Sequence, residues 1–223
     1  MAGGRGVLVV TLPVLLLKLS EGMLISVEIF VLTLIFSLPL GLLVAFGRMS
    51  ENSVIKNVTK VYISILRGTP LILQLMVVYF GPYYIFKLPT PNRFLAVIVG
   101  FVLNYAAYFA EIYRAGIESM PVGQYEAAQV LGYNKTQTFI KIILPQVVKR
   151  ILPPVTNEVI TLIKDTSLAF VISVGEMFTA AKAIASAQGS MLPFISAGIF
   201  YYVFNFIVAM TMEWLERKFS YFK

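Results

Sequence analysis

Long apolar stretches separated by short polar ones dominate this sequence. The first, Met23 to Gly47, contains a single charged residue, Glu28, and exceeds the roughly 20 apolar residues that a helix needs to cross a bilayer. Of the 223 residues, 58% are hydrophobic and 13% are charged, whereas a soluble domain is about 45–50% apolar and about 25% charged. We therefore predict an all-α, polytopic helical membrane protein, with one domain over residues 1–223 and a core at about 23–215.

Five membrane-spanning segments are predicted from these stretches. They are Met23 to Gly47, Val58 to Phe86, Phe94 to Tyr113, a fourth that begins near Gln146, and Met191 to Met212. The segment Thr166 to Ala187 is moderately apolar and fits either a short outer helix or a re-entrant segment. The run Val7 to Leu17 is too short to span the bilayer, and we expect it to lie at the membrane interface.

Prolines are expected to interrupt or bend several of these segments. Proline lacks the amide hydrogen and clashes with the carbonyl one helical turn earlier. We therefore expect Pro13 to interrupt the run from Val7 to Leu17, and Pro39 to kink the first span. The pair Pro153-Pro154 is expected to interrupt the fourth span, with a helix restarting at Pro154.

The second span contains the polar sequence Arg67-Gly68-Thr69-Pro70. Leu71 to Phe86 alone is short for a span, so we predict one span broken at Gly68-Thr69. Thr69 suits the N-cap of the restarted helix, and Pro70 suits its first turn. A helix that restarts inside the membrane presents free N–H groups, which transporters use to hold anionic substrate groups. The alternative is a cytoplasmic loop before an ordinary span.

The residue types that are missing exclude several chemistries. The chain has no Cys and no His, which removes disulfides, thiolate or imidazole metal sites, cysteine nucleophiles and Ser-His triads. It also has no G-x-x-x-x-G-K-[ST] run that could hold ATP phosphates. If ATP drives this protein, another chain binds the ATP.

The stretch Tyr125 to Pro145 is a polar, charged interruption between two apolar spans. Glu126 to Leu131 are good helix formers, and Gly132 can end that helix because glycine adopts a left-handed conformation at no steric cost. A second helix is predicted from Lys135 to Leu144, with Pro145 kinking or ending it. The stretch therefore predicts two short helices joined by a turn.

This stretch resembles the EAA loop of the membrane subunits of ABC importers. The pattern is Glu126-Ala127-Ala128, followed by Gly132, Ile142 and Leu144-Pro145, each at the spacing of that family. In the family the loop, here 117–145, lies in the cytoplasm and docks into a groove on the ATPase subunit. The resemblance implies that the residues in contact with an ATPase are Glu126, Ala127, Ala128 and Gly132.

Three further segments resemble signatures of the permeases for polar amino acids, the subfamily for histidine, glutamine, glutamate and basic amino acids. They are Arg67 to Leu71, Ala107 to Ile117 continuing at Gly123 to Glu126, and Asn157-Glu158 with Lys164 to Leu168. The family often has glycine at the position of Ala115. The resemblance extends from about Met23 to the C-terminus.

The resemblance implies the transmembrane domain of a type I ABC importer for amino acids. In such importers two permease subunits, identical or paired with a sister subunit, sit on two ATPase subunits, and an external solute-binding protein delivers the amino acid. The partner ATPase binds ATP and Mg²⁺, so this chain is expected to be non-catalytic and to need no cofactor of its own. ATP binding closes the ATPases, and the coupling helices then move the spans to alternate access.

The distribution of basic residues orients the chain in the membrane. With the EAA loop and the C-terminus inside, eleven of the 18 Lys and Arg residues lie inside and six outside, and Arg67 is unassigned. Basic residues are enriched in cytoplasmic loops. We therefore predict a multi-pass protein of the cell membrane with an external N-terminus. The net charge of +7 follows the same rule and implies no nucleic-acid partner.

Two carboxylates in the fourth span are the main candidates for substrate contact. Glu158 and Asp165 are seven residues apart, so they project from nearly the same side of a helix, and intramembrane carboxylates usually face a cavity or a partner. We expect them to bind the amino and cationic side-chain groups of a substrate such as arginine, lysine or histidine. Pairing with each other or with Lys164, and a place for Asp165 at the outer interface, are the alternatives.

Five further residues are weaker candidates for substrate contact. Asn104, Asn157 and Thr161 offer polar side chains, and Gly68 and Thr69 offer backbone N–H groups for a carboxylate.

Two other functional classes are weighed against the importer. An ion-coupled carrier or a channel that works without an ATPase has no use for a docking loop, so the EAA spacing argues against it. An intramembrane enzyme without His or Cys is left with an aspartyl-type pair, and Glu158 and Asp165 on one helix fit that poorly.

Overall fold

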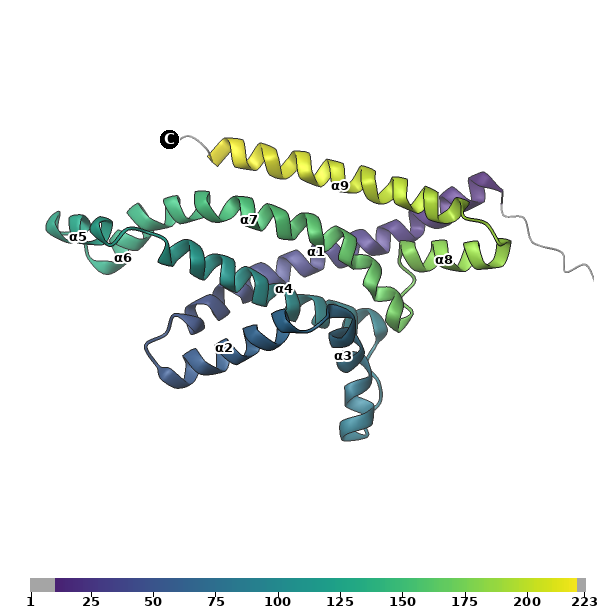
Figure 1. Cartoon of the computed structure of the whole chain (residues 1–223), viewed down its shortest axis with the longest axis horizontal. Coiled ribbons are helices and arrows are strands. Elements are labelled where there is room, and N and C mark those ends of the chain that lie inside the picture. The colour runs from purple at the N-terminus through teal and green to yellow at the C-terminus, as the bar shows by residue number, and fades with distance from the viewer. Residues whose placement is uncertain (1–10, 220–223) are drawn as a thin grey trace, which may run out of the picture. The chain divides into compact units, whose positions relative to one another are not determined.

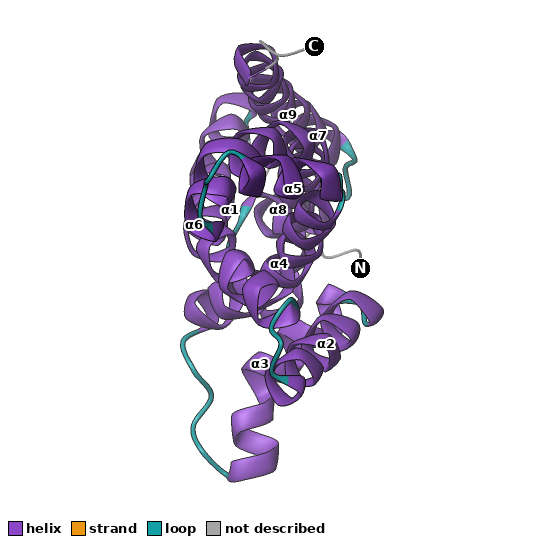
Figure 2. Ribbon diagram, turned by 90° about the vertical axis from the view of Figure 1, so that its left-hand side faces the viewer, coloured by secondary structure: helices purple, strands orange, loops and turns teal. Residues whose placement is uncertain are grey.

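The computed structural model describes residues 11–219, and every regular element in that range is a helix (Figure 1, Figure 2). The α-helices are α1 (Leu12–Arg48), α2 (Ser53–Gly68), α3 (Leu71–Phe86), α4 (Arg93–Glu118), α5 (Val122–Val130), α6 (Lys135–Thr138), α7 (Leu144–Asp165), α8 (Met177–Gln188) and α9 (Leu192–Phe219). A π-helical turn, Phe139–Ile143, joins α6 to α7, and a 3-10 helix, Thr166–Ile172, follows α7. The all-α prediction is confirmed.

Three of the described helices, α1, α4 and α9, are long and apolar enough to cross a membrane. The number rises to five if each of two bent pairs is one span, namely α2 with α3, and residues 135–172 with α8. The break predicted at Gly68-Thr69 is present, because α2 ends at Gly68 and α3 begins at Leu71. The first, third and fifth predicted segments correspond to α1, α4 and α9, the second to the bent pair of α2 and α3, and the fourth to α7 within the other bent pair.

Helix α1 begins earlier than predicted. It starts at Leu12, so Leu12 to Leu17 belong to the first long helix and do not form a separate interfacial run; Val7 to Val10 lie outside the described residues. Pro13 does not interrupt this helix, because it lies in the first turn, where an amide hydrogen has no partner inside the helix. Pro39 lies inside α1 without ending it.

Helix α7 corrects two further expectations about proline. Pro145 lies in its first turn, and Pro153 and Pro154 both lie inside it, so the helix neither ends at Pro145 nor restarts at Pro154. The π-helical turn directly before α7 is closed by a hydrogen bond from the Leu144 N–H to the Phe139 carbonyl. Residues five apart are joined by this bond, as in the single π-helical turns that occur within α-helices. Membrane helices tolerate proline where neighbouring groups satisfy the freed backbone atoms.

The described chain forms two compact units, each assembled from three segments. The first unit contains residues 11–33, 71–100 and 161–208, and the second contains 34–70, 101–160 and 209–219.

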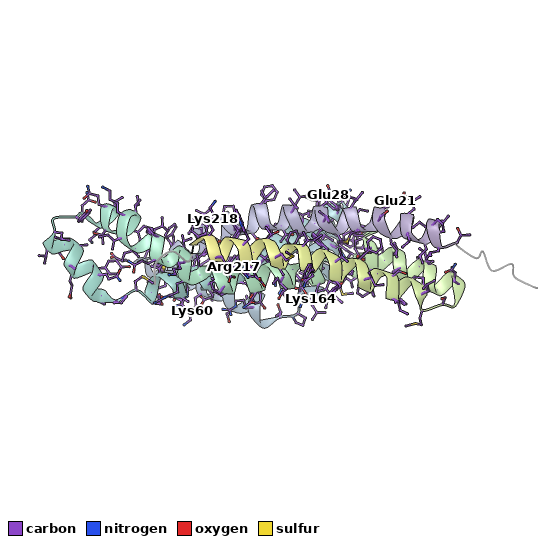
Figure 3. The ribbon with its side chains drawn as sticks, turned by 90° about the horizontal axis from the view of Figure 1, so that it is seen from above. Glu21, Glu28, Lys60, Lys164, Arg217 and Lys218 are labelled. Atoms are coloured by element: carbon purple, nitrogen blue, oxygen red, sulfur yellow. The ribbon has the colours of Figure 1, made fainter. Side chains whose placement is uncertain are left out.

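The first unit has an apolar core between the N-terminal part of α1, α8 and α9. Its buried residues are Leu15, Leu19, Met177, Ala181, Ile184 and Ala197. The buried carboxylate of Glu176 caps α8 by accepting from the N–H groups of Phe178 and Thr179, both at 2.7 Å. The Tyr201 hydroxyl on α9 donates to the same carboxylate at 3.3 Å. By contrast, Glu21 and Glu28 are exposed along α1 (Figure 3).

The second unit has two apolar clusters that hold its helices together. Ala45, Ile63, Ala107 and Ala110 join α1, α2 and α4, and Ile117, Met120, Ile143 and Val147 join α4, the π-helical turn and α7. The Tyr62 hydroxyl adds a polar link by donating to the Leu103 carbonyl at 2.6 Å. These contacts fix α2, α4 and α7 around the candidate site.

Candidate functional site

A pocket of about 390 Å³ lies within the second unit. It is lined from three helices: Arg67 on α2; Tyr108, Glu111, Ile112, Ala115 and Gly116 on α4, with Ser119 just after it; and Arg150, Ile151, Pro154 and Glu158 on α7. Its wall combines two cationic and two anionic side chains with apolar ones.

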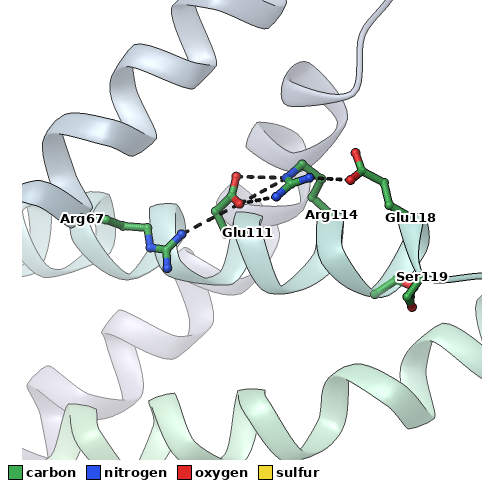
Figure 4. Close-up of polar contacts among 6 residues, drawn as sticks. Arg67, Glu111, Arg114, Glu118 and Ser119 are labelled. Carbon is green, nitrogen blue, oxygen red and sulfur yellow. Dashed lines mark hydrogen bonds and ion pairs between the residues drawn. The ribbon is translucent and has the colours of Figure 1, made fainter.

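Glu111 is the centre of a charge network beside this pocket (Figure 4). Its carboxylate accepts from Arg114 Nε at 3.1 and 3.2 Å and from Arg114 Nη2 at 2.6 Å. Arg114 also bonds Glu118 one turn later. Arg67 approaches Glu111 from α2, with 3.9 Å between the nearest charged atoms. Glu111 and Arg114 are three residues apart on one helix, a spacing at which side chains are neighbours.

Arg67 and Arg150 are held in different ways. The Arg67 guanidinium carbon lies 5.1 Å from the centre of the Tyr108 ring, a cation–π distance. Arg150 instead donates from Nη1 to the Ser119 carbonyl at 2.8 Å, and so links α7 to the end of α4. The packing of α4 on α7 is also close, because a Cβ added at Gly116 would lie 2.2 Å from Ile151 Cγ2.

The predicted substrate residues are distributed unevenly over the structure. Glu158 lines the pocket, and Asn157 is exposed beside it on α7. Thr161 and Asp165 belong to the part of α7 assigned to the first unit and are not among the residues that line the pocket. Asn104 is buried and donates to the Leu66 carbonyl at 3.1 Å.

Gly68 and Thr69 lie at the break between α2 and α3, next to Arg67. Both are exposed, and the Thr69 hydroxyl donates to the Ile65 carbonyl at 2.8 Å. That bond joins Thr69 to the end of α2, whereas the sequence suggested an N-cap for the next helix.

Four residues that line the pocket were not predicted as site residues: Arg67, Tyr108, Glu111 and Arg150. A partial signal was present, because Arg67 directly precedes the predicted break and Tyr108 and Glu111 are spaced at i and i+3. No sequence pattern indicated Arg150, because its place in the pocket depends on the packing of α7 on α4.

The loop 117–145 is built around α5 and α6. Helix α5 begins at Val122, four residues before the predicted start at Glu126. Gly132 has φ +81°, the left-handed conformation expected of a residue that ends a helix. Asn134 caps α6 through a capping box with Gln137. The predicted helix Lys135 to Leu144 is instead divided into α6, the π-helical turn and the start of α7.

The predicted coupling residues differ in exposure. Glu126, Ala127 and Gly132 are exposed, whereas the Ala128 side chain is 1% exposed. Beside Ala127 the loop presents two apolar side chains to the outside, Val130 at 88% exposure and Leu131 at 73%.

A pair of amide side chains ties the loop to α7. The Gln124 amide donates to Gln146 Oε1 at 2.9 Å, and the Gln146 amide donates back to Gln124 Oε1 at 2.6 Å. Together with the cluster around Ile143 and Val147, this pair connects α5 to the helix that carries Glu158.

Comparison with known proteins assigns the family. Residues 37–221 match the family described as "Binding-protein-dependent transport system inner membrane component". The L-cystine transport system permease protein TcyB of Bacillus subtilis is 36% identical over 204 residues, covering 90% of this chain and 86% of that protein. The arginine transport system permease protein ArtQ of the same organism is 38% identical over 199 residues, with coverages of 89% and 90%. The putative glutamine transport system permease protein GlnP of Rickettsia bellii is 33% identical over 204 residues, with coverages of 91% and 93%.

Similar solved structures support the same family assignment. A chain from the crystal structure of an amino acid ABC transporter with histidines superposes with a TM-score of 0.83 at 32% identity, covering 90% of this chain and 94% of that one. The inward-facing methionine ABC transporter MetNI gives a TM-score of 0.70 at 17% identity, covering 94% and 99%, which shows a common fold. The fold is therefore that of a type I ABC importer transmembrane domain, and the chain is embedded in a membrane. This chain belongs to the family of binding-protein-dependent transport system inner membrane components, and within it resembles the permease subunits of amino-acid ABC transporters.

Proposed function

We propose that this permease subunit imports a polar or basic amino acid such as arginine, lysine or histidine, and that Glu158 binds its ammonium group. The observation that carries the proposal is that Glu158 lines the pocket of the second unit together with Arg67 and Arg150. Charged side chains inside a membrane are costly and mark substrate pathways. A pocket with charges of both signs is suited to a small ligand that also carries both.

Asp165 is proposed to act on the same pathway as Glu158. It lies two helical turns later on α7, and residues seven apart project from nearly the same side of a helix. Asn157 and Thr161 are exposed on α7 and supply polar groups near the two carboxylates. Asn104 acts differently in this proposal, because its amide bonds Leu66 and stabilises the end of α2.

The loop 117–145 is proposed to dock on an ATPase subunit. The exposed side chains of Ala127, Val130 and Leu131 form an apolar surface on an otherwise polar loop, which suits a protein partner. The partner binds ATP and Mg²⁺, and this chain contributes the pathway but no catalytic residue. The proposal includes a second permease subunit, an external solute-binding protein, a cytoplasmic loop and C-terminus, and an external N-terminus in the cell membrane.

Glu158→Gln in the purified permease–ATPase complex is expected to weaken amino-acid binding by at least tenfold, because glutamine keeps the size of the side chain and removes its charge. A tenfold loss is about 1.4 kcal/mol. The measurement is radioligand binding with arginine, lysine, histidine, glutamine and cystine, and the matched control is Glu51→Gln, an exposed carboxylate outside the pocket. Unchanged affinity in Glu158→Gln, or a wild-type complex that binds none of these amino acids, contradicts the proposal.

A further inference from the structure

Arg67 places a guanidinium in the wall of the pocket, at the end of α2. The helix ends one residue later, at Gly68, and α2 and α3 together make up one candidate span. The Arg67 side chain is 42% exposed and lines the pocket with Glu158. A charged residue within a span is expensive and usually serves a pathway or a ligand. Arg67 therefore needs an explanation beyond the stability of the helix.

The contacts of Arg67 within the second unit leave its hydrogen-bonding capacity largely unused. Its 3.9 Å approach to Glu111 is longer than a hydrogen bond. Glu111 already accepts three hydrogen bonds from Arg114, which neutralises the carboxylate from the other side (Figure 4). Arg67 is thus near a negative charge that stabilises it, but Glu111 does not saturate its N–H donors.

Tyr108 orients the Arg67 guanidinium. The ring supports the face of the guanidinium at 5.1 Å, and a cation–π contact of this kind uses the π-electrons and none of the N–H groups. The N–H groups at the edge remain available. A guanidinium presents them as a planar fork that matches the two oxygens of a carboxylate.

Arg150 provides a contrast within the same pocket. Its Nη1 donates to the Ser119 carbonyl at 2.8 Å, so this guanidinium ties α7 to the end of α4. Of the two arginines in the wall, Arg150 is committed to packing between helices, and Arg67 is the one suited to a ligand.

We propose that Arg67 binds the α-carboxylate of the transported amino acid while Glu158 binds its ammonium group. The pocket then selects a zwitterion, with the cationic contact supplied by α2 and the anionic contact by α7. This inference rests on the proposed function and adds a specificity-determining residue to it. It predicts that the protein discriminates strongly between an amino acid and the amine left after its carboxylate is removed.

The test compares five pairs of ligands on the purified permease–ATPase complex: arginine with agmatine, lysine with cadaverine, histidine with histamine, glutamine with 4-aminobutanamide, and cystine with cystamine. For the pair whose amino acid binds, the wild type is expected to prefer the amino acid by at least tenfold. In Arg67→Gln the preference is expected to fall to about unity, through loss of amino-acid affinity with amine affinity unchanged. Arg67→Lys should restore part of the preference. The matched control Arg217→Gln, at an exposed arginine that does not line the pocket, should keep the wild-type ratio.

The outcomes separate this inference from the proposed function. If Arg67→Gln keeps the wild-type preference, the carboxylate contact is refuted while amino-acid binding stands. If Arg67→Gln loses the amino acid and the amine equally, Arg67 is structural and the inference also fails. If the wild type binds neither member of any pair, the proposed function fails as well. Co-purification of the ATPase and the melting temperature of each variant show whether it has folded. If Arg67→Gln does not fold, the preference for the amino acid over its amine is measured in Arg67→Lys instead.

Discussion

Replacing Ala127 with tryptophan is expected to leave ATP hydrolysis running in the purified complex while substrate uptake into proteoliposomes falls to background. Ala127 is exposed on α5, so the larger side chain meets no buried neighbour in its own chain. Alanine allows the surface of a partner to approach the helix backbone closely, and an indole at that position holds the partner away. The permease then no longer follows the movement of the ATPase.

The two alanines of the motif are expected to respond differently. Ala128 is buried in the second unit, so Ala128→Trp should disturb the loop itself and reduce the yield of folded complex. Ala187, which is exposed on α8, provides the matched surface control, and Ala187→Trp should transport normally. Uptake at the wild-type rate by Ala127→Trp would show that this face of α5 does not meet the ATPase.

The features that were predicted correctly depend on neighbouring residues in the sequence. The break after Gly68 follows from Thr69-Pro70, and the end of α5 follows from Gly132, whose φ of +81° suits glycine. Each of these depends on a short stretch of chain, so local propensity was sufficient.

The breaks predicted at Pro13, Pro145 and Pro153-Pro154 are absent, because local rules were applied without their context. Pro13 and Pro145 both lie in first turns, where the missing amide hydrogen costs little. The sequence could not show that the helices begin at Leu12 and Leu144. Pro153 and Pro154 remain inside α7, although the expected penalty for proline in a helix interior is about 3 kcal/mol. Both prolines are exposed, so the helix is stabilised by the apolar residues that it buries elsewhere, such as Val147 and Val159.

The pocket could be predicted only in part, because it is a product of tertiary packing. Glu158 was found through the cost of an intramembrane carboxylate, a property of one residue. Arg67 and Arg150 lie 83 positions apart in the sequence and line one pocket because α2 and α7 both pack around α4. Asp165 shows the converse, since its spacing from Glu158 was correct but did not place it among the residues of this pocket.

Gly116→Ala is expected to destabilise the complex by about 1–3 kcal/mol, the usual cost of overpacking. Two effects oppose each other at this position. Alanine is favoured over glycine in a helix by about 1 kcal/mol. Against this, the new Cβ would lie 2.2 Å from Ile151 Cγ2, far inside the roughly 3.5–4.0 Å separation at which carbon atoms attract. The clash should win, because Cγ2 is bonded to Cβ and cannot move without a shift of the Ile151 side chain or of α7.

The double variant Gly116→Ala/Ile151→Ala identifies the source of this loss. Removing Cγ2 opens the contact, so adding alanine at Gly116 should cost far less in the Ile151→Ala background than in the wild type. The measurement is the melting temperature of all four members of the cycle in one detergent, since residues in contact give a non-additive result. Gly123→Ala is the control for helix propensity, because a Cβ there meets nothing within 4 Å. Since Gly116 and Ile151 both line the pocket, additive losses would mean that α4 and α7 do not approach this closely, and the pocket between them would have to be wider than the structure shows.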